Sequence, residues 1–256
     1  MPMRFGLDDY IDADVSYLMG LIIARGTIRQ SPSRSIIIQF PYSSLVIEGI
    51  STSFNQERSI KLGLIEIQER LQELLDTDIQ RNSRDHGEDL VISFQRNSLI
   101  WRDILLLTDN VLAYSNFKVP SVFFDSDLPR EWKREFIKGY GDANGNIRKS
   151  NTYVDGRYRV RLDVLNYNTN WEVPVQICHL LQEQLDVPVH MITWGHPNMG
   201  RDFREHQINV FADEYLNIGF TFEHKQKILE ELSDENRRIA PNAKTSFCPG
   251  RKRIRK

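Results

Sequence analysis

The chain has 256 residues, a length that fits one large or two small domains. Apolar residues make up 40% of it and charged residues 27%, a balance too apolar for a disordered chain and sufficient to bury a core. No apolar run approaches the roughly 20 residues that span a bilayer, so neither a membrane protein nor a signal peptide is predicted. Cys178 and Cys248 are too few for a disulfide framework, and we expect a reducing compartment, either cytoplasmic (nucleoid-associated) or organellar.

The charges are nearly balanced overall but are unevenly placed. Lys and Arg number 33 against 35 Asp and Glu, a formal net charge of −2. From Val15 to Ile47 there is no acidic residue, and from Gly145 to Arg161 the only acid is Asp155. Basic stretches within a neutral chain are compatible with binding of nucleic acid on one face.

The order of the expected elements occurs twice along the chain, which indicates an internal duplication. In the first half, Val15, Leu18 and Ile22 recur at helical spacing, Gly26 ends that helix, and a turn at 31–34 separates two short strands. The expected elements are a helix over 12–25, strands over 27–30 and 35–40, a helix over 58–75, strands over 79–84 and 89–96, and a helix over 98–107.

The same order returns after a linker. The expected elements are a helix over 129–144, strands over 146–153 and 158–166, a mainly helical segment over 171–186, strands over 187–194 and 203–211, and short helices over 212–218 and 224–236. We therefore divide the chain into an N-terminal half (1–117), a linker (118–128), a C-terminal half (129–238) and a basic, mobile tail (239–256).

One local string opens both halves, LMGLIIARG at 18–26 and IKGYGDANG at 137–145. Gly20 and Ala24 lie four residues apart, as do Gly139 and Ala143, so each helix presents a stripe of small residues. Two such stripes allow helix backbones to approach more closely than the usual distance of about 8–10 Å. The sequence predicts that these four residues form the interface between the two helices.

With two such strings, each followed by a strand hairpin, the chain resembles the two-motif LAGLIDADG homing endonucleases over 12–236. The resemblance implies an α+β fold of two pseudo-symmetric αββαββα halves that meet along the motif helices. It also implies a monomeric saddle whose two antiparallel sheets contact the major groove of double-stranded DNA. No cofactor is expected, except Mg²⁺ if the chain is an active endonuclease.

The resemblance fails at the residues that carry the chemistry. In that family the penultimate residue of each motif is an acid that holds a divalent metal ion at the scissile phosphates. Here the two positions are Arg25 and Asn144; a guanidinium has no lone pair for a metal ion, and an amide offers one neutral oxygen. Asp142 lies two residues earlier, about 200° around the helix, and is expected to cap or to pack. We therefore predict no catalytic or metal site, leave a residual role for Asp142 open, and expect Arg25 to contact a DNA phosphate.

Alternation along the predicted strands separates a polar face from an apolar one. Arg159 and Arg161 alternate with Val160 and Leu162, for example. Outward positions are polar in any sheet with one solvated face, but the shortage of acids here favours contact with DNA. The residues predicted to contact DNA are Arg25, Thr27, Arg29, Arg34, Ser35, Gln39, Arg81, Arg148, Ser150, Thr152, Arg157, Arg159, Arg161, Arg201 and Arg204.

Three functions remain open from the sequence. The first is a sequence-specific, catalytically inactive DNA-binding protein, such as the recognition module of a restriction or other DNA-processing system with further protein subunits. The second is a group I intron maturase that binds structured RNA. The third is a nuclease that uses atypical metal ligands. The spacing of His190, His196 and His206 matches no metal signature.

Overall fold

The computed structural model describes residues 10–47, 55–113, 115–152, 156–165, 171–194 and 205–240. In the first half these residues form helices and strands in the order that the sequence predicts, with one short additional helix, α2. The elements are α1 (Ala13–Arg25), β1 (Gly26–Arg29), β2 (Arg34–Pro41), α2 (Tyr42–Leu45), α3 (Gln56–Leu75), β3 (Ile79–Arg84), β4 (Gly87–Phe94) and α4 (Leu99–Leu107). None of the helices over the described ranges has the length and apolar character needed to cross a membrane.

A short 3-10 helix, η2 (Ser121–Phe124), lies in the predicted linker and precedes the second half. The elements that follow are α5 (Arg130–Asn144), β5 (Gly145–Thr152), β6 (Tyr158–Val164), α6 (Glu172–His179), the π-helical η3 (Leu180–Gln184), β7 (Val189–Thr193), β8 (His206–Phe211), α7 (Ala212–Tyr215) and α8 (Glu223–Ile239). Helix α8 therefore extends to the first residue of the predicted tail, and 241–256 lie outside the described residues.

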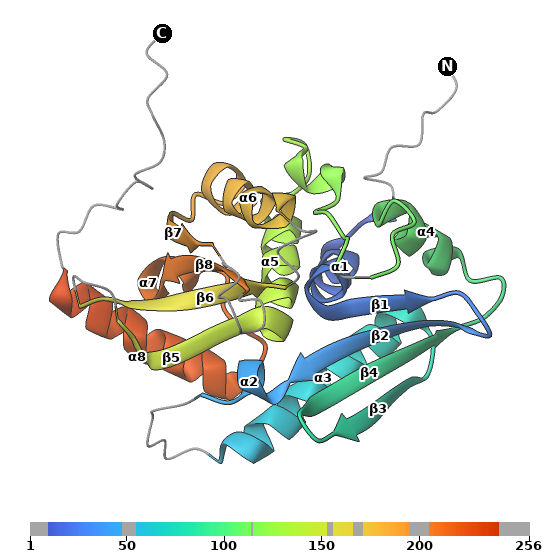
Figure 1. The fold of residues 1–256 in the computed structure, drawn as a ribbon, viewed down its shortest axis with the longest axis horizontal. Coiled ribbons are helices and arrows are strands. Elements are labelled where there is room, and N and C mark those ends of the chain that lie inside the picture. Colours follow the sequence, from blue (N-terminus) through green and yellow to red (C-terminus); the bar gives the residue numbers. More distant parts are fainter. Residues whose placement is uncertain are drawn as a thin grey trace, which may run out of the picture.

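Each half contributes one antiparallel four-stranded sheet over the ranges described. The strand orders are β1-β2-β4-β3 and β5-β6-β8-β7, so the second sheet repeats the topology of the first. Figure 1 shows α1 and α5 side by side at the centre of the molecule, with one sheet on either side of them. The predicted α+β fold with two antiparallel sheets is confirmed.

Helix α1 is apolar on every side because it is enclosed on every side. The Asp12 side chain caps its N-terminus by accepting from the main-chain nitrogen of Val15 at 2.7 Å. From Val15 to Ala24 every residue is buried, against β2, α3 and α5. A helix with a hydrophobic surface all round is typical of a position in the interior of a protein, and here it joins the cores of both halves.

The two helices touch backbone to backbone at their glycines. A Cβ added to Gly20 would lie 2.8 Å from the main-chain nitrogen of Tyr140 and closer still to the carbonyl oxygen of Phe136. A Cβ added to Gly139 would overlap the carbonyl oxygen of Tyr17 in the same way. Ala24 and Ala143 are both buried, at 2% and 0% exposure, so the structure places all four small residues inside the molecule.

A second contact joins the halves between α3 and the start of α8. Gly63 on α3 faces the ring of Phe222, which occupies the space that a side chain at Gly63 would need. The imidazole of the buried His224 forms a hydrogen bond at each nitrogen. Nδ1 pairs with Ser59 Oγ at 3.1 Å, and Nε2 pairs with the carbonyl oxygen of Leu45 at 2.8 Å. This contact crosses between halves at residues that no sequence motif distinguishes.

Candidate nucleic-acid interface

Arg25 and Asn144, which replace the two expected acids, lie together at the C-terminal ends of α1 and α5. Arg25 Nε donates to Asn144 Oδ1, and Asn144 Nδ2 donates to the carbonyl oxygen of Ala24 at 3.0 Å. Asn144 is fully buried and Arg25 is half-buried. Because the C-terminal end of a helix carries partial negative charge, the Arg25 cation is favourably placed where two such ends meet.

The donor set at this point does not fit a divalent metal ion. Mg²⁺ takes oxygen ligands, and carboxylates are the usual protein contribution, whereas the Arg25 guanidinium is a cation without a lone pair. The amide oxygen of Asn144 already accepts from Arg25. Over the described residues, no group of three or more His, Cys, Asp and Glu side chains is placed to hold a metal ion.

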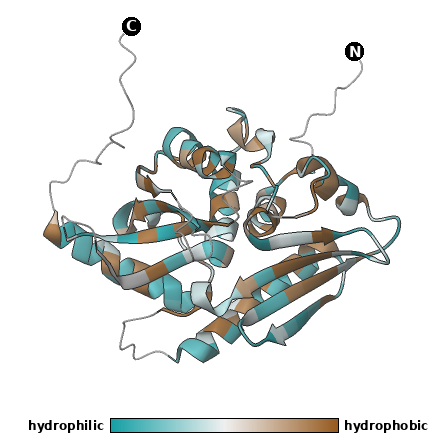
Figure 2. Ribbon diagram, viewed as in Figure 1, coloured by the Kyte–Doolittle hydropathy of each residue, from teal (hydrophilic) through white to brown (hydrophobic). Residues whose placement is uncertain are grey.

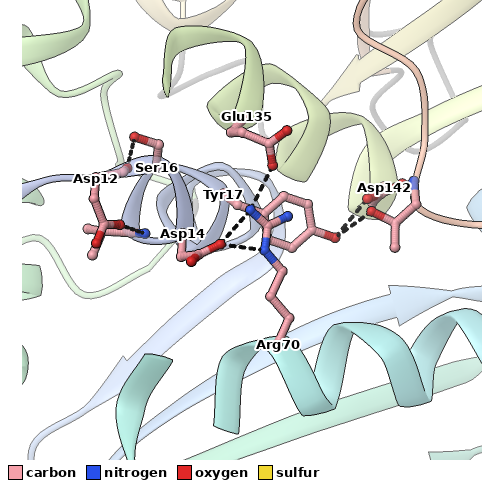
Figure 3. Close-up of polar contacts among 9 residues, drawn as sticks. Asp12, Asp14, Ser16, Tyr17, Arg70, Glu135 and Asp142 are labelled. Carbon is pink, nitrogen blue, oxygen red and sulfur yellow. Dashed lines mark hydrogen bonds and ion pairs between the residues drawn. The ribbon is translucent and has the colours of Figure 1, made fainter. Parts of the chain in front are cut away.

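Asp142 is directed into the contact between the halves. Figure 3 shows the Tyr17 hydroxyl, which donates to Asp142 Oδ2 at 2.7 Å, and the main-chain nitrogen of Thr221 donates to Oδ1 at 3.0 Å. Burial raises the pKa of the Asp142 carboxyl, and the Lys225 ammonium opposes that rise. Both oxygens are therefore engaged within the protein, and Asp142 packs as its offset on the helix suggests.

Lys225 on α8 is a buried cation that sequence reasoning did not single out. Its Nζ donates to the carbonyl oxygens of Asp142 at 3.3 Å and Gly145 at 3.1 Å, so it caps the C-terminal end of α5. Burial lowers the pKa of Lys225 to about 8, and the Asp142 charge acts in the opposite direction. A lysine in a helix with an apolar face gives no sign in the sequence that it is fully buried.

The lowered pKa of Lys225 predicts a pH-dependent stability. Between pH 8 and 10.5 the unfolded chain holds a proton on Lys225 that the folded chain has released, so the free energy of unfolding should rise with pH. We expect this rise in the wild type and not in Lys225→Met, at up to about 1.4 kcal/mol per pH unit of difference. Denaturant titrations of both proteins at several pH values measure it. Parallel pH profiles would show that Lys225 does not titrate in this range.

Arg70 of α3 ties both motif helices together near their N-terminal halves. Its Nη2 lies 2.7 Å from Asp14 Oδ1 on α1 and 2.8 Å from Glu135 Oε2 on α5, as Figure 3 shows. The Arg70 Cζ also lies 4.1 Å from the centroid of the Tyr17 ring, a cation–π distance. Arg70 and the Tyr17–Asp142 hydrogen bond thus fix the two helices at separate points along their length.

The first sheet has an inner face of buried aliphatic side chains and an outer face opposite to it. Ile36 and Ile38 are fully buried on the inner face, so the alternate residues of β2 lie on the outer face. Thr27 pairs with Ile37, and Arg29, which is exposed, pairs with Ser35. The residues predicted to contact DNA that lie on this outer face are Thr27, Arg29, Ser35 and Gln39.

The outer face of the second sheet is richer in guanidinium groups. Val160 and Leu162 are fully buried on the inner face, which places Arg159 and Arg161 on the outer face, where both are half-buried. Arg161 Nη1 donates to Gln207 Oε1 at 3.4 Å. Arg157 lies against the ring of Phe211, with its Cζ 3.6 Å from the ring centroid.

The structure places two of the predicted DNA-contacting residues elsewhere. Arg34 is in register with Phe94, donates to the carbonyl oxygen of Arg96 and lies 6.0 Å from the buried Trp101 ring, so it packs on α4. Arg81 pairs with the buried Leu90 and is therefore on the inner-face side of the edge strand β3. For this reason Arg34 and Arg81 are left out of the candidate surface.

The side chains of the remaining predicted residues lie outside the part of the structure that is described. The side chains of Arg148, Ser150 and Thr152, on β5, lie outside the described part of the structure, as do Arg201 and Arg204 entirely. The candidate surface is therefore built from Arg25 at the centre and from the outer-face residues of the two sheets.

No protein-family model matches the chain. It is 24% identical over 169 residues to a probable translation initiation factor IF-2 of Methanocaldococcus jannaschii, a match that covers 64% of this chain and spans 14% of the length of that relative. Among solved structures it is similar to full-length DUF199/WhiA from Thermatoga maritima, at 12% identity, with 97% of this chain and 65% of that chain covered and a TM-score of 0.49. It is also similar to mesophilic variants of the homing endonuclease I-DmoI, at 15% identity, with 89% and 100% covered and a TM-score of 0.49.

Proposed function

We propose that this chain binds double-stranded DNA in a sequence-specific manner and does not cleave it at the α1–α5 helix ends. The observation that carries the proposal is the contact between Arg25 and Asn144. A two-metal or one-metal nuclease centre needs carboxylates at this point to hold cations against the scissile phosphates. In this chain a side chain supplies the positive charge itself.

Arg25 substitutes for the electrostatic part of a metal ion and not for its chemistry. A guanidinium attracts a phosphate and forms hydrogen bonds with its oxygens, which adds affinity. It does not generate a metal-bound hydroxide or neutralise a leaving oxygen as an inner-sphere ligand. The half-buried Arg25 thus favours a complex in which the backbone at the centre of the site is bound and left intact.

The outer faces of the sheets support the DNA-binding part of the proposal. They carry Arg29 on β1 of the first sheet, and Arg159 and Arg161 on β6 of the second. A two-stranded or larger β surface fits the major groove, whose width is about 12 Å. Arginine, threonine, serine and glutamine provide the donors and acceptors that contact phosphates and base edges.

The proposal is tested by selection followed by a cleavage assay. A pool of random duplexes should yield a bound sequence, and that duplex should stay intact with the protein in Mg²⁺ and in Mn²⁺. The matched comparison is the double variant Arg25→Asp, Asn144→Asp, which introduces two carboxylates and should make DNA affinity dependent on Ca²⁺.

Cleavage by the wild type would contradict the proposed inactivity. Preferential binding of a structured group I intron RNA in competition would contradict the assignment of DNA as the ligand.

A further inference from the structure

The outer faces of the two sheets differ in chemistry at equivalent rows of residues. A row here is a line of paired residues that crosses all four strands of a sheet. The second residue of β1 and the second residue of β5 begin equivalent rows, because both strands start directly after a motif helix. In the first sheet this row is Thr27, Ile37, Val91 and Gln80. In the second sheet it is Asn146, Arg161, Asn209 and Met191.

The centre of the first row is aliphatic. Ile37 and Val91 pair with one another on neighbouring central strands, and both are half-buried on a face that also carries Thr27 and Gln39. The two sheets also differ in Figure 2. Hydrophobic residues form continuous stretches along β2 and β4, whereas hydrophilic and hydrophobic residues alternate along β6. Outer-face positions of a sheet with one buried face are normally polar, so two neighbouring aliphatic residues there need a reason.

The centre of the second row is a guanidinium. Arg161 is half-buried and its neighbour in the row, Asn209, is fully buried. Asn209 Nδ2 donates to Thr193 Oγ1 at 3.2 Å and to the carbonyl oxygen of Gln207 at 3.1 Å, so its amide nitrogen is occupied within the sheet, and its buried amide oxygen can only accept a hydrogen bond. Arg161 is therefore the side chain of this row that is best able to reach a ligand through hydrogen bonds.

These two chemistries correspond to different groups in the major groove. The thymine methyl is the apolar group that base pairs present there, and aliphatic side chains contact it. Arginine makes its best specific contact with O6 and N7 of guanine. Successive outer-face residues of a strand are about 6.8 Å apart. Two base-pair steps of about 3.4 Å cover the same distance along the duplex, so neighbouring rows of the sheet can contact bases that are two steps apart.

We propose that the two halves read different base chemistry: Ile37 and Val91 contact thymine methyls, and Arg161 contacts guanine. This inference rests on the proposed function. Two half-buried aliphatic side chains are far too small a surface to bind a protein, which needs about 800 Å² per partner. The hydrogen-bonding residues Thr27, Gln39 and Gln80 that surround them, and the basic second sheet, fit a nucleic-acid groove.

The test uses base analogues in the duplex that is selected from a random pool. Deoxyuridine lacks the thymine methyl, and 7-deazaguanine lacks the N7 acceptor. Deoxyuridine in one half-site should lower affinity about fourfold for each contacted methyl, the effect of removing one buried methyl, and should do nothing in the other half-site. The 7-deazaguanine substitution should lower affinity at least about fivefold in that other half-site.

Two variants assign each effect to its sheet. In Ile37→Ala the deoxyuridine effect should disappear while the 7-deazaguanine effect remains, and in Arg161→Ala the reverse should hold. Ile37 lies on the outer face, so its truncation leaves the core residues in place. A palindromic selected site, or deoxyuridine effects of equal size in both half-sites, would overturn this inference and leave DNA binding established. If the protein retained no duplex from the random pool, both the inference and the proposed function would be overturned.

Discussion

Gly139→Val is expected to lower the free energy of unfolding by about 3 kcal/mol or more, the upper end of the range for overpacked cores. A side chain at this position meets the main-chain carbonyl of Tyr17, and the backbone of a packed helix relaxes less readily than a side chain. The two helices then have to separate, which also strains the hydrogen bond from Tyr17 to Asp142. Denaturant titration followed by circular dichroism measures the change.

The matched control for this prediction is Glu69→Leu, on the exposed side of α3. A substitution there should change the free energy of unfolding by no more than about 0.5 kcal/mol, because the residue is exposed to solvent. If Gly139→Val were as stable as this control, the close approach of the two helix backbones would be wrong.

The duplicated order of elements was predictable because each half repeats local signals. Strand β3 has the bounds predicted from the neighbouring turn at His86 and Gly87, and both motif helices end directly before the glycine that starts the next strand. These signals lie within a few residues of each other, so they do not depend on the partner half. Helix α2 was not predicted, because a single turn of four residues has no periodicity to detect.

The faces of the strands were predictable only where alternation is regular. Arg159 and Arg161 alternate with buried residues within one strand, and they lie on the outer face. Arg34 and Arg81 are at a strand end and on an edge strand, where their side of the sheet depends on register with β4. Register is set by long-range pairing, which a single strand does not specify.

The candidate site itself depended on two kinds of information. The motif spacing identifies Arg25 and Asn144 as equivalent positions, and their contact follows once the helices pack in parallel register. Lys225 comes from the last helix and reaches the carbonyl of Gly145 across the second half. No local pattern relates a residue of α8 to the end of α5, so this buried cation required the tertiary structure.

Replacing Arg159 and Arg161 together by alanine should weaken binding of the selected duplex at least about tenfold. Each arginine that contacts a base edge or a phosphate contributes on the order of 1–3 kcal/mol, and both lie on the outer face of the second sheet. The dependence of log affinity on log salt should also flatten by about 0.9 for each phosphate contact that is lost. Fluorescence anisotropy across a salt series measures both quantities.

The control for this prediction is Arg58→Ala with Arg81→Ala, which changes the net charge by the same amount. Arg58 is exposed on α3 and Arg81 lies on the inner-face side of β3, so neither belongs to the candidate surface. If the effect came from overall charge, the two double variants would lose the same affinity. A loss confined to the Arg159 and Arg161 variant places the DNA on the outer face, and equal losses would refute that placement. The distinction matters because the net charge of the chain is −2, so binding to a polyanion has to come from where the cations are and not from how many there are.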